Sequence, residues 1–137
     1  MLIQPANIKQ LLTVRLNPGD EIYSALNEAI RREKINNAII LTGVGSVNAF
    51  HYHVVSTPEM PPENAFVKGE KAMDIVNING MVLEGRLHSH IIFSDTKVAL
   101  GGHMEPGCRV LTFAVVVFAL LDGVDLTGWD GFEVMDN

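Results

Sequence analysis

Three of the five histidines lie close together in the sequence, with a spacing that suits a metal site. His88 and His90 are separated by one residue, and His103 follows after a short polar run. Alternate side chains of a β-strand point to the same face, so His88 and His90 share a face if this stretch is a strand. Three neutral imidazoles with an open fourth position are one known arrangement for catalytic zinc. The spacing therefore predicts a divalent metal site, with zinc as the expected ion.

The third histidine joins the other two only if the chain forms a hairpin in the right register. Apolar runs flank the polar residues 94–97, a pattern typical of strand, tight turn and strand. If Asp95 and Thr96 form a two-residue turn, His88 lies directly opposite His103. A loop longer or shorter by one residue would place His103 on the other face. The alternative is that the histidines are separate polar residues on a solvated face.

A second His-x-His, formed by His51 and His53, offers further imidazoles. Both side chains would again lie on one strand face. They could add a ligand or replace the first group if their strand neighbours the hairpin. Otherwise they belong to a solvated or interface face.

A carboxylate beside the metal could act as a general base or fix the tautomer of a ligand. Glu84 shares the strand face of His88 if that strand stays regular, and it is the predicted catalytic residue. Glu105 shares the face of His103 only if the extended chain continues past Met104. The following Pro106 argues against that extension.

The rest of the chain predicts an α+β fold, with a central, mostly antiparallel sheet and one main flanking helix. Asn17-Pro18-Gly19 is a turn signal that ends a first strand. Asp20 is the expected N-cap of an amphipathic helix that runs to about Glu33. Asn79-Gly80 is typical of a type I′ hairpin turn. The predicted strands span residues 8–16, 38–42, 47–57, 72–78, 81–93, 98–104 and 108–121, with a short final strand in the tail 122–137.

The last long apolar run indicates contact with another chain. Residues 108–121 are almost all apolar, as expected for a strand buried on both faces. A lone antiparallel sheet needs only one buried face. A neighbouring copy is therefore expected to cover part of this strand.

Composition narrows the functional classes. A chain of 137 residues, 47% hydrophobic, matches a single domain spanning 1–137. The lone Cys108 and a start without export features predict a reducing, cytoplasmic location and a buried thiol. No apolar run is long enough to cross a membrane. Ten basic against sixteen acidic residues, a net charge of −6, argue against autonomous nucleic-acid binding.

Five short motifs, taken in order, resemble the PPC (plants and prokaryotes conserved) domain family from about Val14 to Leu121. The resemblance implies an α+β fold, assembly as a homotrimer and, in prokaryotic members, a zinc site formed by three histidines. Those ligands correspond to His88, His90 and His103. The motifs are residues 16–22, 41–47, 78–80, 88–90 and 101–104.

The family is widely described as DNA-binding, because plant members combine this domain with an AT-hook. This sequence has no Arg-Gly-Arg-Pro core, so that label rests on analogy between folds. Two functions remain open. One is a metal-dependent enzyme acting on a small molecule, of hydrolase or lyase type. The other is a trimeric binding or regulatory module, associated with DNA or not, whose metal is structural or sensory.

Overall fold

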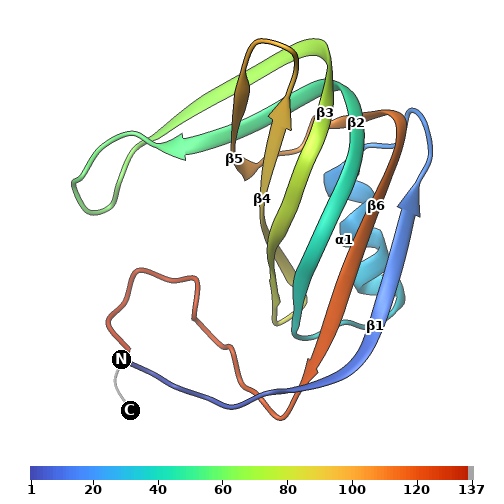
Figure 1. Ribbon diagram of the computed structural model, residues 1–137. Helices are drawn as coiled ribbons and strands as arrows, with labels where there is room; N and C mark the ends of the chain where they lie inside the picture. The colour runs from blue at the N-terminus through green and yellow to red at the C-terminus, as the bar shows by residue number, and fades with distance from the viewer. Residues whose placement is uncertain (136–137) are drawn as a thin grey trace.

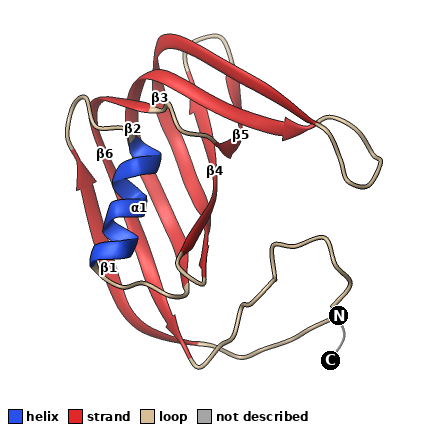
Figure 2. Ribbon diagram, turned by 180° about the vertical axis from the view of Figure 1, so that it is seen from behind, coloured by secondary structure: helices blue, strands red, loops and turns tan. Residues whose placement is uncertain are grey.

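Six antiparallel strands form one sheet, and a helix covers one of its faces (Figures 1 and 2). The computed structural model describes residues 1–135. The strand order is β1-β6-β2-β3-β4-β5, and β5 also pairs with β2, so the last four strands close on themselves at one end. This confirms the predicted α+β class. The elements are β1 (Asn7–Leu16), α1 (Ile22–Arg32), β2 (Ala38–Val55), β3 (Asn64–Leu83), β4 (Arg86–Ser94), β5 (Ala99–Met104) and β6 (Arg109–Asp122).

The helix α1 lies where its amphipathic pattern predicted it, although a different residue caps it. The Glu21 carboxylate accepts hydrogen bonds from the backbone N–H groups of Tyr23 and Ser24, at 3.2 and 2.8 Å. Asp20, the predicted cap, instead accepts from the backbone N–H of Asn17 at 2.7 Å. The apolar side of the helix packs into the core through Ile22, Leu26 and Ile30.

The hairpin turn between β3 and β4 is not at the predicted Asn79-Gly80. β3 runs through that dipeptide, and the chain reverses at Glu84 and Gly85, whose φ angles are 52° and 78°. Two consecutive residues with positive φ are typical of a type I′ turn. Gly80 serves another purpose, since a Cβ there would lie 2.2 Å from the carbonyl oxygen of His88. This glycine lets β4 approach β3 closely.

Two other strand predictions also change. The segments predicted at 38–42 and 47–57 form one strand, β2, whose pairing with β6 is interrupted by register shifts. Such irregularities bend and twist a strand without ending it. In the described part of the tail, residues 123–135 form turns and no strand. The last two residues of the predicted tail strand lie outside the described residues.

The strand β6 is buried on one face only, which corrects the expectation for a single chain. Its inward residues, among them Val116 and Phe118, are fully buried. Leu111 and Phe113 remain 38% and 42% exposed. Further exposed apolar side chains lie on the neighbouring strands, and we call the whole set the apolar patch: Leu11, Leu41, Val44, Leu111 and Phe113. Within the described residues, no helix is long and apolar enough to cross a membrane.

Candidate metal centre

Four histidines meet where β2, β5 and β4 lie side by side. His53 of β2 pairs with His103 of β5, and His103 in turn pairs with His90 of β4. His88 lies two residues before His90, on the same strand face. The residues between and beside them on β4, Leu87, Ser89 and Ile91, are buried, so the histidines occupy the face opposite α1.

The predicted ligands His88, His90 and His103 are brought together. One ligand atom from each lies within 4.8 Å of the others. The ring of His103 is central, with its centroid 4.8 Å from that of His88 and 5.4 Å from that of His90. On the other side of His103, the ring of His53 is stacked at 4.6 Å.

The register that unites them differs from the predicted one by two residues. His103 lies opposite His90, not His88, because the loop between β4 and β5 spans four residues, Asp95–Val98. The Asp95 carboxylate stabilises this loop by accepting from the backbone N–H groups of Lys97 and Val98. A shift of two residues leaves every side chain on its face. The predicted cluster therefore forms despite the wrong turn.

Gly102 allows β5 to approach β2 closely enough to bring His103 beside His53. A Cβ at this position would lie 2.3 Å from the carbonyl oxygen of His53. Only glycine fits between the two backbones without moving one of them. The glycine next to the central histidine is therefore part of the construction of the site.

The cluster favours neutral imidazoles. Burial, followed by the neighbouring His88, His53 and His90, lowers the pKa of His103 to about 4, and the nearby Glu105 acts in the opposite direction. Burial, followed by His88 and His53, also lowers the pKa of His90. Imidazole binds a metal through a deprotonated nitrogen, so these rings are in the binding form at neutral pH.

Two carboxylates flank the histidines from opposite sides. The Glu105 carboxylate lies 2.6 Å from Nδ1 of His53, and these two residues with His103 form a second group that could hold a metal ion. The Asp130 carboxylate lies 3.6 Å from Nδ1 of His88. Sequence reasoning weighed Glu105 and missed Asp130. No local pattern marks Asp130, because it follows β6 in a segment without strand periodicity.

Glu84, the predicted catalytic residue, does not share the strand face of His88. The strand ends at Leu83, and Glu84 occupies the turn, where its carboxylate accepts a hydrogen bond from the Thr127 hydroxyl at 2.8 Å. Neither group of potential metal ligands within residues 1–135 includes it. The premise of a regular strand from Glu84 to His88 is therefore wrong.

The second His-x-His divides its roles. His53 joins the cluster, whereas Nδ1 of His51 lies 2.9 Å from the carbonyl oxygen of Pro106. Beneath them, Cys108 is fully buried, as predicted, and its thiol lies 3.3 Å from the carbonyl oxygen of His51. Burial raises the pKa of this thiol to about 11, which makes it a packing residue rather than a nucleophile.

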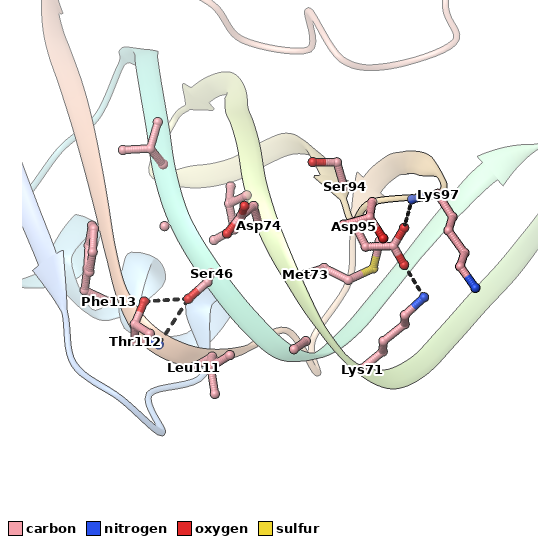
Figure 3. A pocket seen from close by; sticks show the side chains of 15 residues that line it. Ser46, Lys71, Met73, Asp74, Ser94, Asp95, Lys97, Leu111, Thr112 and Phe113 are labelled. Atoms are coloured by element: carbon pink, nitrogen blue, oxygen red, sulfur yellow. Dashed lines mark hydrogen bonds and ion pairs between the residues drawn. The ribbon is translucent and has the colours of Figure 1, made fainter.

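A separate hollow, lined by none of the histidines, lies on the sheet (Figure 3). It has a volume of about 950 Å³ and lies between β2, β3, β6 and the loop after β4. Among its polar side chains, the hydroxyls of Ser46 and Thr112 are hydrogen-bonded to each other, and Lys71 forms an ion pair with Asp95. Val44, Leu111 and Phe113 of the apolar patch also line it. The hollow thus continues the exposed apolar surface, and the histidine cluster lies outside it.

Comparison with known sequences identifies the class of this chain. The sequence model of the Plants and Prokaryotes Conserved (PCC) domain matches residues 3–121. The bifunctional protein GlmU of a Synechococcus strain is 24% identical over 116 residues, which cover 84% of this chain and 17% of that protein. The chain therefore spans about a sixth of the length of this curated relative.

Solved structures share the fold. A hypothetical protein from Salmonella enterica is 27% identical, with a TM-score of 0.72 over 88% of this chain and 81% of its own. A metal-containing protein from Archaeoglobus fulgidus is 18% identical, with a TM-score of 0.76 over 88% of this chain and 86% of its own. A putative DNA-binding protein from Bacteroides thetaiotaomicron is 21% identical, with a TM-score of 0.71 over 82% and 80%.

Proposed function

The chain belongs to the Plants and Prokaryotes Conserved (PCC) domain family, and on that premise we propose that it is a zinc-binding homotrimer acting on a small molecule. The observation that carries the proposal is the convergence of His88, His90 and His103 on one face, with ligand atoms within 4.8 Å. A metal-containing relative in structure adds support.

The donor set suits zinc or a similar divalent ion. Nitrogen ligands at about 2.0–2.1 Å from zinc are the norm, and three imidazoles leave a coordination position open. Side-chain rotation can bring the three rings onto one ion, because His88 and His90 lie toward the surface of the cluster. Imidazole also suits several other transition metals, so zinc is the expected ion rather than a required one.

The chemistry follows from the groups around the three ligands. A divalent ion bound there supplies a Lewis acid, which polarises a carbonyl or lowers the pKa of water. The pair of His53 and Glu105, adjacent to His103, can accept and pass on a proton. These functions fit a hydrolase or a lyase acting on an oxo acid. The base role predicted for Glu84 stays a prediction, and Glu84→Gln tests it.

Assembly as a trimer is supported by the apolar patch. Its side chains lie on three adjacent strands, and Leu11, Leu41 and Val44 are each between 45% and 57% exposed. Extended apolar surfaces on soluble proteins mark contact sites. A second copy of this chain is the proposed occupant. Light scattering at micromolar concentration should report a trimer, and a monomer would contradict this part of the proposal.

A regulatory module is the second candidate, since a structural relative carries a DNA-binding name. The net charge of −6 opposes direct binding to duplex DNA. Binding gains free energy when Lys and Arg side chains replace the counterions on the phosphates, and this chain has few basic residues for that exchange. We predict that binding to random duplex is weaker than the roughly 10⁻⁴ to 10⁻⁶ M typical of non-specific binders at physiological salt. Tighter binding in a fluorescence anisotropy titration, weakening steeply with added salt, would favour this candidate.

Metal content tests the main proposal. Protein purified without a histidine tag should contain about one zinc or similar ion per chain by mass spectrometry. His90→Ala should reduce the content sharply, because it removes one of three ligands. His51→Ala is the matched control, as that ring lies against Pro106 and should leave the content unchanged. Full metal content in His90→Ala would exclude this ligand set.

A cytoplasmic location stays a prediction that rests on the lone cysteine.

A further inference from the structure

The chain continues beyond its family match and folds back toward the metal site. The match ends at residue 121, and residues 123–135, the C-terminal segment, follow β6. Figure 1 shows this segment leaving the end of β6 and turning back toward β4. Leu126 anchors the segment, since it is only 3% exposed. The side-chain amide of Asn37 holds the segment by donating to the carbonyl oxygen of Val124 at 3.1 Å.

The segment places a carboxylate beside one of the proposed ligands. One oxygen of Asp130 accepts a hydrogen bond from the Arg86 guanidinium at 2.9 Å. The other oxygen lies 3.6 Å from Nδ1 of His88. The Asp130 side chain is mostly covered, with 16% of it exposed, whereas the side chains of its partners Arg86 and His88 are 63% and 40% exposed. Arg86 opens β4, two residues before His88, and so both partners of Asp130 come from one strand.

We propose that Asp130, which lies outside the matched family region, is a positioning residue that orients His88 for metal binding. The inference rests on the proposed metal function. At 3.6 Å the carboxylate oxygen faces Nδ1 at ion-pair distance. A small rotation of the His88 ring makes it a hydrogen-bond acceptor, which favours the tautomer with its proton on Nδ1 and leaves Nε2 as the ligand atom. Carboxylates paired in this way with metal-binding histidines fix the ring and raise the basicity of the ligand.

The contact with Arg86 explains why Asp130 is expected to orient a metal ligand and not to coordinate the metal itself. The guanidinium already binds one carboxylate oxygen, and its charge favours the ionised form of Asp130. Direct coordination would compete with that ion pair. On the far side of the cluster, the Glu105 carboxylate lies 2.6 Å from Nδ1 of His53, and the ring of His53 is stacked on the proposed ligand His103. Asp130 is thus the counterpart of Glu105, contributed by a part of the chain that the family match does not include.

The test compares zinc affinity in the full-length wild type and in Asp130→Ala by competition with a chromophoric chelator. Loss of an outer-shell carboxylate should weaken zinc binding by about 10- to 100-fold. Asp130→Asn should give an intermediate loss. Glu133→Gln, which removes a negative charge from an exposed side chain of the same segment, is the matched control and should bind zinc like the wild type.

A second readout separates positioning from a purely structural role. Long-range ¹H–¹⁵N spectra of the metal-free protein should show the Nδ1–H tautomer of His88 in the wild type and a shift toward Nε2–H in Asp130→Ala. Unchanged affinity, or an unchanged tautomer, would overturn the inference while leaving the metal function intact. A wild type that binds no zinc would instead remove the proposed function, and this inference with it.

Discussion

The two carboxylate–histidine pairs beside the cluster have the same chemistry but are held in place by different parts of the structure. Glu105 and His53 belong to the closed part of the sheet, where His53 is itself paired with His103 across two strands. Asp130 and His88 meet through a segment of turns held by a few contacts. We call these two regions the sheet side and the tail side. The difference teaches that the two sides of the proposed metal site are held in different ways, one by strand pairing and one by a segment that can open locally.

The sheet side and the tail side differ in the free energy needed to open them locally. Opening the sheet side requires breaking the pairing of β5 with β2 and exposing buried residues such as Met104. Opening the tail side requires loss of the ion pair between Arg86 and Asp130 and exposure of Leu126. Segments with few buried contacts open at the lowest free energies of a protein. A substitution that disrupts packing should therefore lower the free energy of unfolding much more on the sheet side than on the tail side.

The largest expected effect is on the sheet side, from Gly102→Ala. The added side chain collides with the backbone of His53 and forces β5 away from β2. Overpacking of this kind costs roughly 1–3 kcal/mol or more, and the separation of His103 should also abolish zinc binding. Urea denaturation and metal analysis measure the two effects. On the tail side, the matched variant Gly131→Ala places a Cβ 3.1 Å from the carbonyl oxygen of Gly128 and should cost much less. Equal losses in the two variants would contradict the comparison.

A smaller effect is expected from Glu105→Gln. The amide keeps the shape of the side chain but removes the negative charge that acts to raise the pKa of the proposed ligand His103. The ligand becomes less basic, so zinc affinity should fall by about 10-fold. The fold should be unaffected, because Glu105 lies at the end of the sheet. Chelator competition and the thermal midpoint, Tm, check both statements. Glu70→Gln, on an exposed position of β3, is the control. A loss of affinity in the control as large as in Glu105→Gln would show a general charge effect.

The smallest effect is the pH dependence of the metal-free protein, which also separates the two sides. The folded pKa of His103 is about 4 against an ordinary 6.5, so between these values the unfolded chain binds more protons. Stability is therefore full above pH 6.5 and falls as the pH drops toward 4. Between pH 7.5 and 5, Tm should decrease by a few degrees.

On the tail side, the group that titrates is Asp130, and it does so at lower pH than His103. Burial acts to raise the pKa of Asp130, but the charge and hydrogen bond of Arg86 lower it below the ordinary 3.8. Its contribution is lost only as the pH falls below that value. Between pH 7.5 and 5, His103→Gln should therefore flatten the change in Tm, and Asp130→Asn should leave it as in the wild type. The reverse result would place the sensitive group on the tail side.

The sequence predicted what depends on local pattern and strand periodicity. The amphipathic helix, the antiparallel sheet and the shared face of His88, His90 and His103 all follow from such patterns and are found in the structure. The position of the turn between β3 and β4 was harder to predict, because Asn79-Gly80 is more typical of a type I′ turn than Glu84-Gly85. The choice between them depended on how closely β4 approaches β3 at Gly80. The wrong turn then misplaced Glu84.

Long-range contacts account for what the sequence did not predict. Asp130 reaches His88 across more than forty residues of chain, through a segment with no periodic pattern. His53 reaches His103 only because β5 closes onto β2, a pairing that no turn signal encodes. Both contacts depend on tertiary structure, and a single sequence carries no local sign of them.

The four-residue loop between β4 and β5 has an evolutionary consequence. If the turn keeps its length of four residues, adding or removing two residues shifts the register of β5 but keeps His103 on the face of His88 and His90, whereas a change of one residue turns it to the opposite face. Selection for the metal site should therefore act on parity. Among relatives that keep the three histidines, insertions and deletions in this loop should come in even numbers, unless a bulge compensates for an odd one.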